Sequence, residues 1–283
     1  MADVRMRVNG RDGDGISTLD RGLAYGDGLF ETLRIEHGAA QHWPLHRERL
    51  LTGCARLGIA GVDTAAIETD IAAMAPGVTL GVLKIIVTRG VGGRGYRPPV
   101  RDVTRPTRIV QVHPYPEYDV RHWTDGIALR TCTHRLPSHA ALAGMKHLNR
   151  LDQVLARAEW SDPAIAEGLM LDYNDHVIAG TMSNVFFVVA GVLHTPDLAQ
   201  SGIAGITRQR ILAHAEHRGL IARIGHYTLD DLLAADELFV CNSVIGVWPV
   251  GQFNGRPFTR GSVTTALAAA CGGTAPAGVA VRP

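Results

Sequence analysis

The lysines are the residues of this chain best suited to amine chemistry. Of its 28 lysines and arginines, only Lys84 and Lys146 are lysines. A GC-rich gene would account for the bias towards arginine, but it does not explain why lysine is kept at these two positions. Lysine differs from arginine because its amine can lose a proton and attack a carbonyl group.

The surroundings of the two lysines differ. Lys84 lies in an alternating apolar run, residues 82–87, and is expected to point outwards from a strand. Lys146 lies between a loop rich in Ser, His, Ala and Gly and an expected helix. Lys146 is therefore the candidate for covalent chemistry.

A second segment, residues 201–208 (SGIAGITR), could hold an anion. Two glycines precede an expected helix start, where backbone N–H groups and the Thr207 hydroxyl can converge on a phosphate. An ordinary capped helix fits the same spacing, which leaves both readings open. Together with Lys146, the segment suggests pyridoxal phosphate, because that cofactor needs an amine for a Schiff base and an anchor for its phosphate.

The run at residues 90–95 (GVGGRG) matches the dinucleotide-binding pattern G-x-G-x-x-G, but its context argues against that function. A helix should begin at the last glycine, whereas Tyr-Arg-Pro-Pro follows it here. We expect a flexible, arginine-bearing loop that could hold an anionic substrate, and a plain surface loop is equally consistent. There is no G-x-S-x-G motif and no spacing typical of a metal site.

The bulk composition excludes several classes of function. A net charge of +1 gives no broad attraction to nucleic acid or anionic membranes. No apolar run approaches the ~20 residues that span a bilayer, and the N-terminus lacks a signal-peptide core. Four widely spaced cysteines are expected to be free thiols in a reducing cytoplasm.

The hydrophobic pattern predicts an α+β fold with two domains rather than a strict βαβ alternation. Strands are expected at 5–8, 30–35, 80–88, 108–112, 127–131, 167–172, 177–178, 185–189, 192–195 and 237–241, and helices at 44–57, 63–74, 149–160, 207–218 and 229–234. Two prolines near residue 115 suggest an extended linker. We therefore expect an N-terminal domain over 1–114, a linker over 115–120 and a C-terminal cofactor-binding domain over 121–283.

Several motifs resemble those of fold-type IV pyridoxal-phosphate enzymes. Segments 20–32 (DRGLAYGDGLFET), 46–50 (HRERL) and 181–186 (TMSNVF) are similar to motifs of the whole family. Segments 89–96 (RGVGGRGY) and 146–155 (KHLNRLDQVL) more closely resemble the aminodeoxychorismate lyases within it. The resemblance implies a small N-terminal α/β sandwich, a larger C-terminal pseudo-barrel and a homodimer.

The resemblance also implies residue roles. Lys146 would bind the cofactor and transfer the proton, and Arg49 would pair with the cofactor phosphate. Ile206, Thr207 and Ser243 would complete the phosphate site, Ser243 because 242–249 (NSVIGVWP) resembles the family's C-terminal phosphate turn. Arg94 and Tyr96 would contact substrate carboxylates, and Thr32 would line the same pocket.

One position departs from the family pattern. Where its members usually have Glu before the Gly-Thr of the T-x-S-N-x-F strand, pairing with the protonated pyridine nitrogen, this chain has Ala179. Three interpretations stay open: a lyase that tolerates alanine, an engineered variant, or a relative with altered chemistry. Asp175, four residues earlier and beyond a turn, gives no reason to expect a substitute.

The activity implied by the resemblance is conversion of 4-amino-4-deoxychorismate to 4-aminobenzoate and pyruvate, a step of folate biosynthesis. One alternative is a branched-chain or D-amino-acid aminotransferase of the same fold. Another, from a different class, is a protein that binds the cofactor with little catalysis, which Ala179 keeps open and Lys146 argues against.

Overall fold

The computed structural model describes residues 4–99, 105–277 and 279. The chain divides into two compact units: Met1–Pro116 with Met145–Asn149, and Glu117–Gly144 with Arg150–Pro283. The first change of unit falls inside the expected linker at 115–120. The return of residues 145–149 to the first unit was not expected from the sequence. The division into two folding domains stays a prediction.

The first unit is built on an antiparallel sheet with the strand order β2-β1-β6-β5-β3-β4. The strands are β1 (Arg5–Val8), β2 (Arg11–Asp12), β3 (Gly28–Glu36), β4 (Ala39–Ala40), β5 (Leu80–Thr88) and β6 (Thr107–Pro114). Along β3 the odd-numbered residues are buried, and the even-numbered residues from 30 to 36 are half-buried. This alternation gives the sheet one closed face and one more open face.

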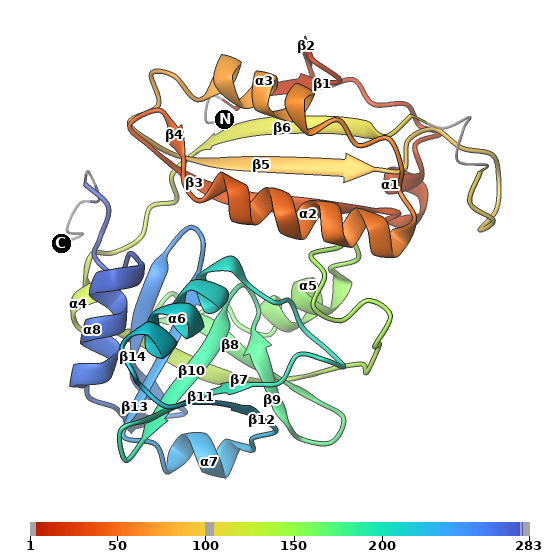
Figure 1. Ribbon diagram of the computed structural model, residues 1–283. Coiled ribbons are helices and arrows are strands. Elements are labelled where there is room, and N and C mark those ends of the chain that lie inside the picture. Colours follow the sequence, from red (N-terminus) through yellow and green to blue (C-terminus); the bar gives the residue numbers. More distant parts are fainter. Residues whose placement is uncertain (1–3, 100–104, 278, 280–283) are drawn as a thin grey trace. The chain divides into compact units, whose positions relative to one another are not determined.

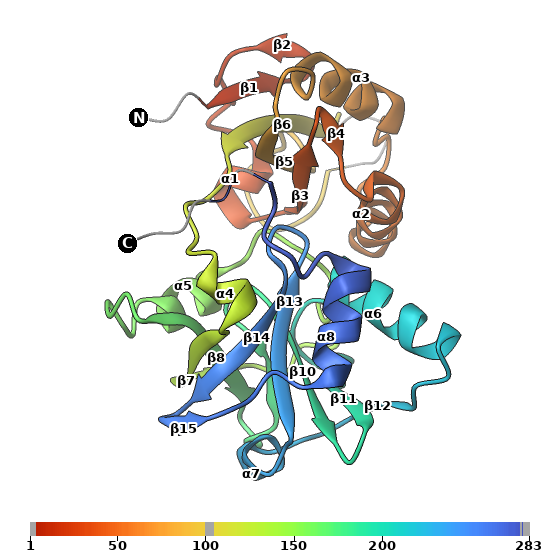
Figure 2. The same ribbon diagram turned by 90° about the vertical axis from the view of Figure 1, so that its left-hand side faces the viewer.

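Among the described residues of this unit, the helices beside the sheet are α1 (Arg21–Tyr25), α2 (Trp43–Leu57) and α3 (Thr64–Met74). Helix α2 has Pro44 in its first turn and ends at Gly58, which adopts a left-handed conformation that favours glycine. Asp63 caps α3 by accepting a hydrogen bond from the Ala66 N–H. Helices α2 and α3 pack on β3 and β6 and lie on the same side of the sheet (Figures 1 and 2).

The second unit contains a mixed sheet with the order β12-β11-β10-β13-β14-β7-β8-β9, in which β15 also pairs with β14. Its strands are β7 (Ile127–Leu136), β8 (Ile165–Asp172), β9 (Val177–Gly180), β10 (Asn184–Val189), β11 (Val192–Pro196), β12 (Ala222–Gly225), β13 (Glu237–Asn242), β14 (Gly246–Phe253) and β15 (Arg256–Pro257). Strand β9, at one end, also packs against β10 and β11 near the other end. The sheet therefore curls into an incomplete barrel, and the α+β prediction is confirmed.

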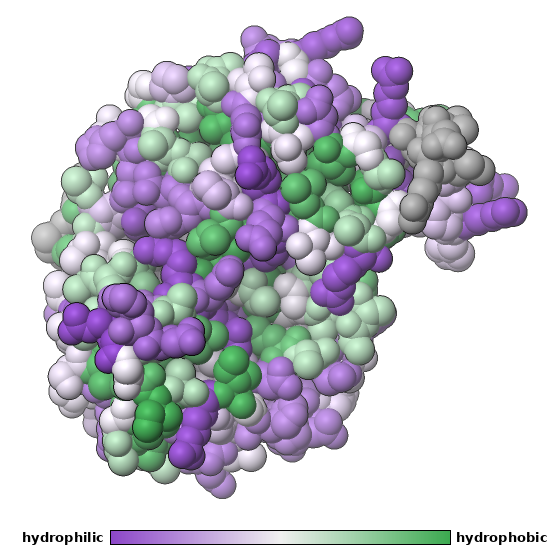
Figure 3. All heavy atoms as spheres, viewed as in Figure 1, coloured by the Kyte–Doolittle hydropathy of each residue, from purple (hydrophilic) through white to green (hydrophobic). Residues whose placement is uncertain are grey.

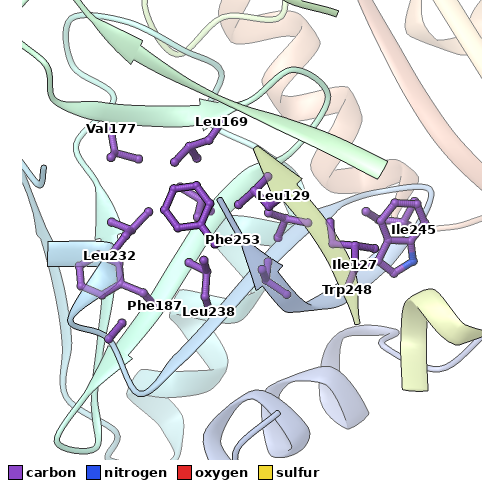
Figure 4. Close-up of a cluster of buried hydrophobic side chains, with 14 of the residues drawn as sticks. Ile127, Leu129, Leu169, Val177, Phe187, Leu232, Leu238, Ile245, Trp248 and Phe253 are labelled. Carbon is purple, nitrogen blue, oxygen red and sulfur yellow. The ribbon is translucent and has the colours of Figure 1, made fainter. Parts of the chain in front are cut away.

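Apolar side chains from several of these strands fill the curled sheet. They include Ile127 and Leu129 from β7, Leu169 from β8, and Trp248 from β14, all buried members of one cluster (Figure 4). The helices of this unit are α4 (Arg121–Thr124), α5 (Leu151–Arg157), α6 (Ile206–His217), α7 (Leu229–Leu233) and α8 (Ser262–Cys271). Helices α6 and α8 pack against each other and against β13.

Three differences from the expected elements have local causes. Helix α5 is shorter than the expected 149–160: Asn149 belongs to the first unit, and Arg157, the last residue of the helix, donates from its side chain to the Trp160 carbonyl. Strand β7 continues past 131 through an irregularity between Thr131 and Arg135. Strand β14 was not expected because glycines and Pro249 interrupt its pattern.

Hydrophilic and hydrophobic residues are interspersed on the face shown in Figure 3. Within the described ranges, no helix is long and apolar enough to cross a membrane.

Candidate active site

Lys146 lies in a short segment that pairs with the beginning of β3 in the first unit. The Phe30 N–H donates to the Lys146 carbonyl at 2.9 Å, and the Leu148 N–H donates to the Gly28 carbonyl at 3.0 Å. The Lys146 Nζ lies 4.3 Å from the centroid of the Phe30 ring, and Lys84 Nζ lies 5.6 Å from the same centroid. Both amines thus lie near one aromatic ring.

Thr32 belongs to the same face of the sheet as Phe30. The two residues are two positions apart on β3, so their side chains point the same way. Thr32 pairs directly with Lys84 on β5, and both are half-buried. The structure therefore brings Thr32 onto the same face as Phe30, whose ring Lys146 contacts.

Arg49 belongs to a buried ion network on the closed face of the sheet. Its Nε and Nη2 donate to the two oxygens of Glu31 at 2.8 and 2.5 Å, and the His46 Nδ1 lies 2.6 Å from Glu31 Oε2. Burial raises the pKa of the Glu31 carboxyl, but the contacts with His46 and Arg49 outweigh it and hold that pKa below its ordinary value. The charged Glu31 fixes the orientation of the Arg49 guanidinium.

His46 is the neutral member of this network. Burial lowers its pKa, the bond to Glu31 opposes that shift, and the positive charges of Arg49 and Lys146 add to it. Its Nε2 is buried and has no hydrogen-bond partner among the described residues. A proton on Nε2 would lack an acceptor, which explains why the neutral ring is favoured.

In the second unit, a buried carboxylate organises the segment 181–183. Glu167 is fully buried, and its oxygens accept hydrogen bonds from the Thr181 hydroxyl at 2.6 Å and the Ser183 hydroxyl at 2.7 Å. The backbone N–H groups of Gly168, Thr181 and Met182 donate to the same carboxylate. The threonine and serine of the T-x-S-N-x-F motif therefore serve the fold of this turn.

The asparagine of the same motif positions the expected phosphate donors. Asn184 accepts from the Gly205 N–H at 3.0 Å and donates to the Ile203 carbonyl at 2.9 Å. Within the described residues, the N–H groups of Ile206 and Thr207 have no acceptor, and Gly205 offers no side chain to cap α6. Two donors at the start of a twelve-residue helix suit an anion.

Ser243 lies in the turn between β13 and β14, tied to the same motif. Asn242 donates to the Met182 carbonyl at 3.1 Å, and its side-chain oxygen accepts from the Val244 and Ile245 N–H groups. Asn184 pairs with Cys241 in the sheet. Ser243 and the start of α6 are thus both linked to residues 182–184.

Ala179 lies in an apolar environment with no carboxylate in the place of the expected glutamate. It packs in a cluster with Cys132, Met170 and Leu198, and burial raises the pKa of the Cys132 thiol to about 12. Ala179 pairs with Met170, whereas Gly180 pairs with Leu169. Because Leu169 and Glu167 are two positions apart, Glu167 points away from the face that holds Ala179.

Asp175 does not replace the missing carboxylate either. Its side chain is exposed and pairs with Arg135 at 3.0 Å. The structure therefore agrees with the sequence, which gave no reason to expect a substitute there.

The glycine-rich loop carries Arg94 and Tyr96, which are both exposed. Gly90 has φ +88°, and a Cβ there would lie 2.0 Å from the Arg105 carbonyl oxygen. No helix follows this run within residues 96–99. Close backbone packing, and not dinucleotide binding, accounts for this glycine.

The sequence placed Glu31 and His46 in family motifs but gave no indication of the ion network between them. It gave no role to Glu167. A signal was present, since Glu31 and Glu167 each occupy a buried position of an alternating or apolar strand. A charged residue in such a position needs partners. Within the described parts of the chain, no group of three or more His, Cys, Asp or Glu residues is placed to hold a metal ion.

The fold and these motifs define a class of protein. The sequence pattern described as amino-transferase class IV matches residues 28–253, so the chain belongs to this family. A solved structure of 4-amino-4-deoxychorismate lyase from Pseudomonas aeruginosa is 46% identical, with a TM-score of 0.88 over 93% of this chain and 96% of that chain.

Two curated relatives are also similar over most of their length. An aminodeoxychorismate lyase of Vibrio harveyi is 36% identical over 244 residues, 86% of this chain and 89% of that protein. A protein of Methanocaldococcus jannaschii, provisionally named a branched-chain-amino-acid aminotransferase, is 34% identical over 245 residues, 85% of this chain and 83% of that protein.

Proposed function

We propose that this protein is a pyridoxal-phosphate-dependent lyase that converts 4-amino-4-deoxychorismate to 4-aminobenzoate and pyruvate, in folate biosynthesis. The 46% identity to the Pseudomonas aeruginosa lyase, over nearly the whole chain, carries the proposal. The lyase of Vibrio harveyi, at 36% identity, supports it.

The residues present fit the cofactor. Lys146 supplies a primary amine, and Ile206 and Thr207 supply N–H donors that have no acceptor among the described residues. The Thr207 and Ser243 hydroxyls and the Arg49 guanidinium complete the proposed phosphate ligands. When bound, pyridoxal phosphate supplies an aldehyde for the amine and a ring that withdraws electrons from the reacting carbon.

The proposed steps assign one task to each remaining residue. The Lys146 Nζ takes the proton from C4 of the substrate, and the C3–O bond breaks to release enolpyruvate and leave an aromatic ring. Enolpyruvate becomes pyruvate by taking up a proton at its methylene carbon. Arg94 and Tyr96 contact substrate carboxylates, and Thr32 lines the pocket. Aromatisation provides much of the driving force.

Ala179 sets the expected rate. Its apolar neighbours offer no carboxylate to hold a proton on the pyridine nitrogen. Loss of one such charged contact would cost about 2–4 kcal/mol at the transition state, or roughly one and a half to three decades in rate. The aromatic product offsets part of this loss.

A class IV aminotransferase is the second candidate, favoured by the 34% identity to the protein of Methanocaldococcus jannaschii. It would convert the cofactor to its amine form with an amino-acid donor and release no pyruvate from aminodeoxychorismate. A cofactor-binding protein with little catalysis is the third candidate, and Ala179 is the observation that keeps it open.

We also propose a homodimer in the cytoplasm. The dimer rests on the family resemblance. All four cysteines are buried free thiols, which suits a reducing compartment.

The test is release of 4-aminobenzoate from aminodeoxychorismate with added pyridoxal phosphate, for this chain and for Ala179→Glu. Release by both variants supports the lyase, and their ratio measures what the missing carboxylate contributes. Release by the glutamate variant alone would mean that this chain is impaired at the cofactor ring. Release by neither would overturn the lyase, and transamination would be tested next.

A further inference from the structure

Arg21 is buried in α1, and its side chain binds the glycine-rich loop. The residue is 3% exposed. Its Nη1 donates to the Gly95 carbonyl at 2.9 Å and its Nη2 to the Tyr96 carbonyl at 3.2 Å. A Cβ at Gly92 would lie 2.6 Å from Arg21 Cδ, so glycine is required where the loop crosses this side chain.

Tyr25, at the other end of α1, binds the same stretch of loop. Its hydroxyl accepts a hydrogen bond from the Gly95 N–H at 3.1 Å, and its ring packs edge-on against Tyr96 at 5.5 Å. The Arg21 guanidinium also lies over the Tyr25 ring at 4.8 Å. Both peptide groups that flank residue 95 are therefore held by α1.

Arg21 and Tyr25 together form a clamp on Gly95 and Tyr96. Asp27 anchors this clamp to the rest of the first unit. Its carboxylate pairs with Arg21 Nε at 2.9 Å and accepts two hydrogen bonds from Arg89. Arg89 in turn donates to the carbonyls of Leu57, the last residue of α2, and of Gly58, which follows it. Burial raises the pKa of Asp27, but the bonds from Arg89 and Arg21 outweigh it and hold that pKa below its ordinary value. The anchor stays charged.

We propose that Arg21, assisted by Tyr25, is a positioning residue that presents Arg94 to the substrate carboxylate. This inference rests on the proposed function for the role of Arg94. Arg94 itself is exposed, and the carbonyls that follow it in the loop are fixed by Arg21. A preorganised cation binds a carboxylate more tightly because less conformational freedom is lost on binding.

Lysine cannot replace Arg21 in this role. Three separate N–H directions serve Asp27, Gly95 and Tyr96, which suits a planar guanidinium and not a single ammonium group. Arg21→Lys should therefore resemble Arg21→Gln. Tyr25→Phe removes one hydrogen bond and should act in the same direction with a smaller effect.

The experiment compares the holoenzyme with Arg21→Gln, Arg21→Lys and Tyr25→Phe. Arg108→Gln is the matched control, because Arg108 also pairs with a buried carboxylate, Asp70 at 2.6 Å, in the same unit. One readout is the rate of trypsin cleavage after Arg94, identified by fragment mass, because the bonds after Arg97 and Arg105 precede proline but Arg101 is a second possible site. The other is KM and kcat for aminodeoxychorismate, with the visible absorption of the cofactor recorded.

We expect both Arg21 variants to be cleaved after Arg94 at least about tenfold faster than the parent protein. Their KM should rise about tenfold, with a smaller change in kcat and unchanged cofactor absorption. Arg108→Gln should show neither change. Unchanged cleavage in every variant would overturn the clamp, and faster cleavage with unchanged KM would overturn its positioning role.

Failure of the proposed function is distinguishable from failure of the clamp. If the parent protein releases no 4-aminobenzoate, the lyase is wrong and so is the role given to Arg94. The cleavage rates would still decide whether Arg21 holds the loop. If Arg21→Gln does not fold, Tyr25→Phe gives the same two readouts.

Discussion

Asn149 donates a hydrogen bond from Nδ2 to the Gly26 carbonyl at 3.2 Å, across 123 positions of sequence. Gly26 has φ +65° and ends α1. A Cβ at Gly26 would lie 2.5 Å from Asn149 Oδ1. The segment that carries Lys146 can therefore pack on segment 20–32 because position 26 has no side chain.

Gly26→Ala is expected to destabilise the protein more than Gly77→Ala. Gly77 has φ +80° with nothing near its missing Cβ, so alanine there costs only the left-handed strain of about 1–2 kcal/mol. Gly26→Ala also pushes away the end of the exposed Asn149 side chain, so it should additionally lose the Asn149–Gly26 hydrogen bond, about 0.5–1.5 kcal/mol. Urea unfolding of both variants measures the difference, and equal losses would mean that the Asn149 contact imposes no constraint.

Lys146→Ala should abolish both the visible absorption of the bound cofactor and the release of 4-aminobenzoate. Lys84→Ala is the matched control, because its amine lies near the same Phe30 ring but is not the proposed nucleophile. The control should keep both signals. Turnover by Lys146→Ala would show that Lys146 is not the nucleophile. Loss of cofactor absorption in Lys84→Ala but not in Lys146→Ala would give the covalent role to Lys84 instead.

The elements with local signals could be predicted from the sequence. Pro44 and Gly58 predict the limits of α2, and Asp63 predicts the start of α3, because caps act on neighbouring residues. The strand at residues 80–88 is confirmed as β5. Residues 146–155 indicated a functional lysine. The pairing of the Lys146 segment with β3 could not be predicted, because it joins residues far apart in sequence.

The ion networks could not be predicted in the same way. Glu31 bonds Arg49 across 18 positions, and Glu167 bonds Ser183 across 16. Each carboxylate lies at a strand position that faces the core, which indicates that it has a partner. Only the packing of a helix or a hairpin against the strand decides which residue that partner is. Spacing along the chain carries no such information.

Glu167→Gln should lower the free energy of unfolding by about 2–4 kcal/mol. The carboxylate is fully buried and accepts five hydrogen bonds, and an amide would place its own donors against some of these N–H and O–H groups. Glu48→Gln, at an exposed position, should change it by less than about 0.5 kcal/mol. Chemical denaturation of both variants measures the two losses, and similar values would show that the Glu167 charge contributes nothing.

His46 should make the protein less stable as the pH falls from about 7.5 to 5.5. Its pKa is lowered in the folded state by burial and by Arg49 and Lys146, against the opposing effect of Glu31. Below about pH 6.5, the unfolded chain therefore binds a proton that folded His46 does not, so stability is lost as pH falls through that range. Glu31, whose pKa is also lowered, acts in a lower window, below its ordinary value near 4.5.

The comparison is between the parent protein and His46→Gln, by urea unfolding at several pH values between 5.5 and 7.5. Removing His46 should make the dependence of stability on pH shallower, by up to about 1.4 kcal/mol per pH unit at the acidic end. His113, His122 and His194, whose pKa values burial also lowers, are present in both proteins and leave the difference unchanged. Identical slopes would mean that folded His46 takes up its proton over the same pH range as in the unfolded chain, and that its Nε2 finds an acceptor there.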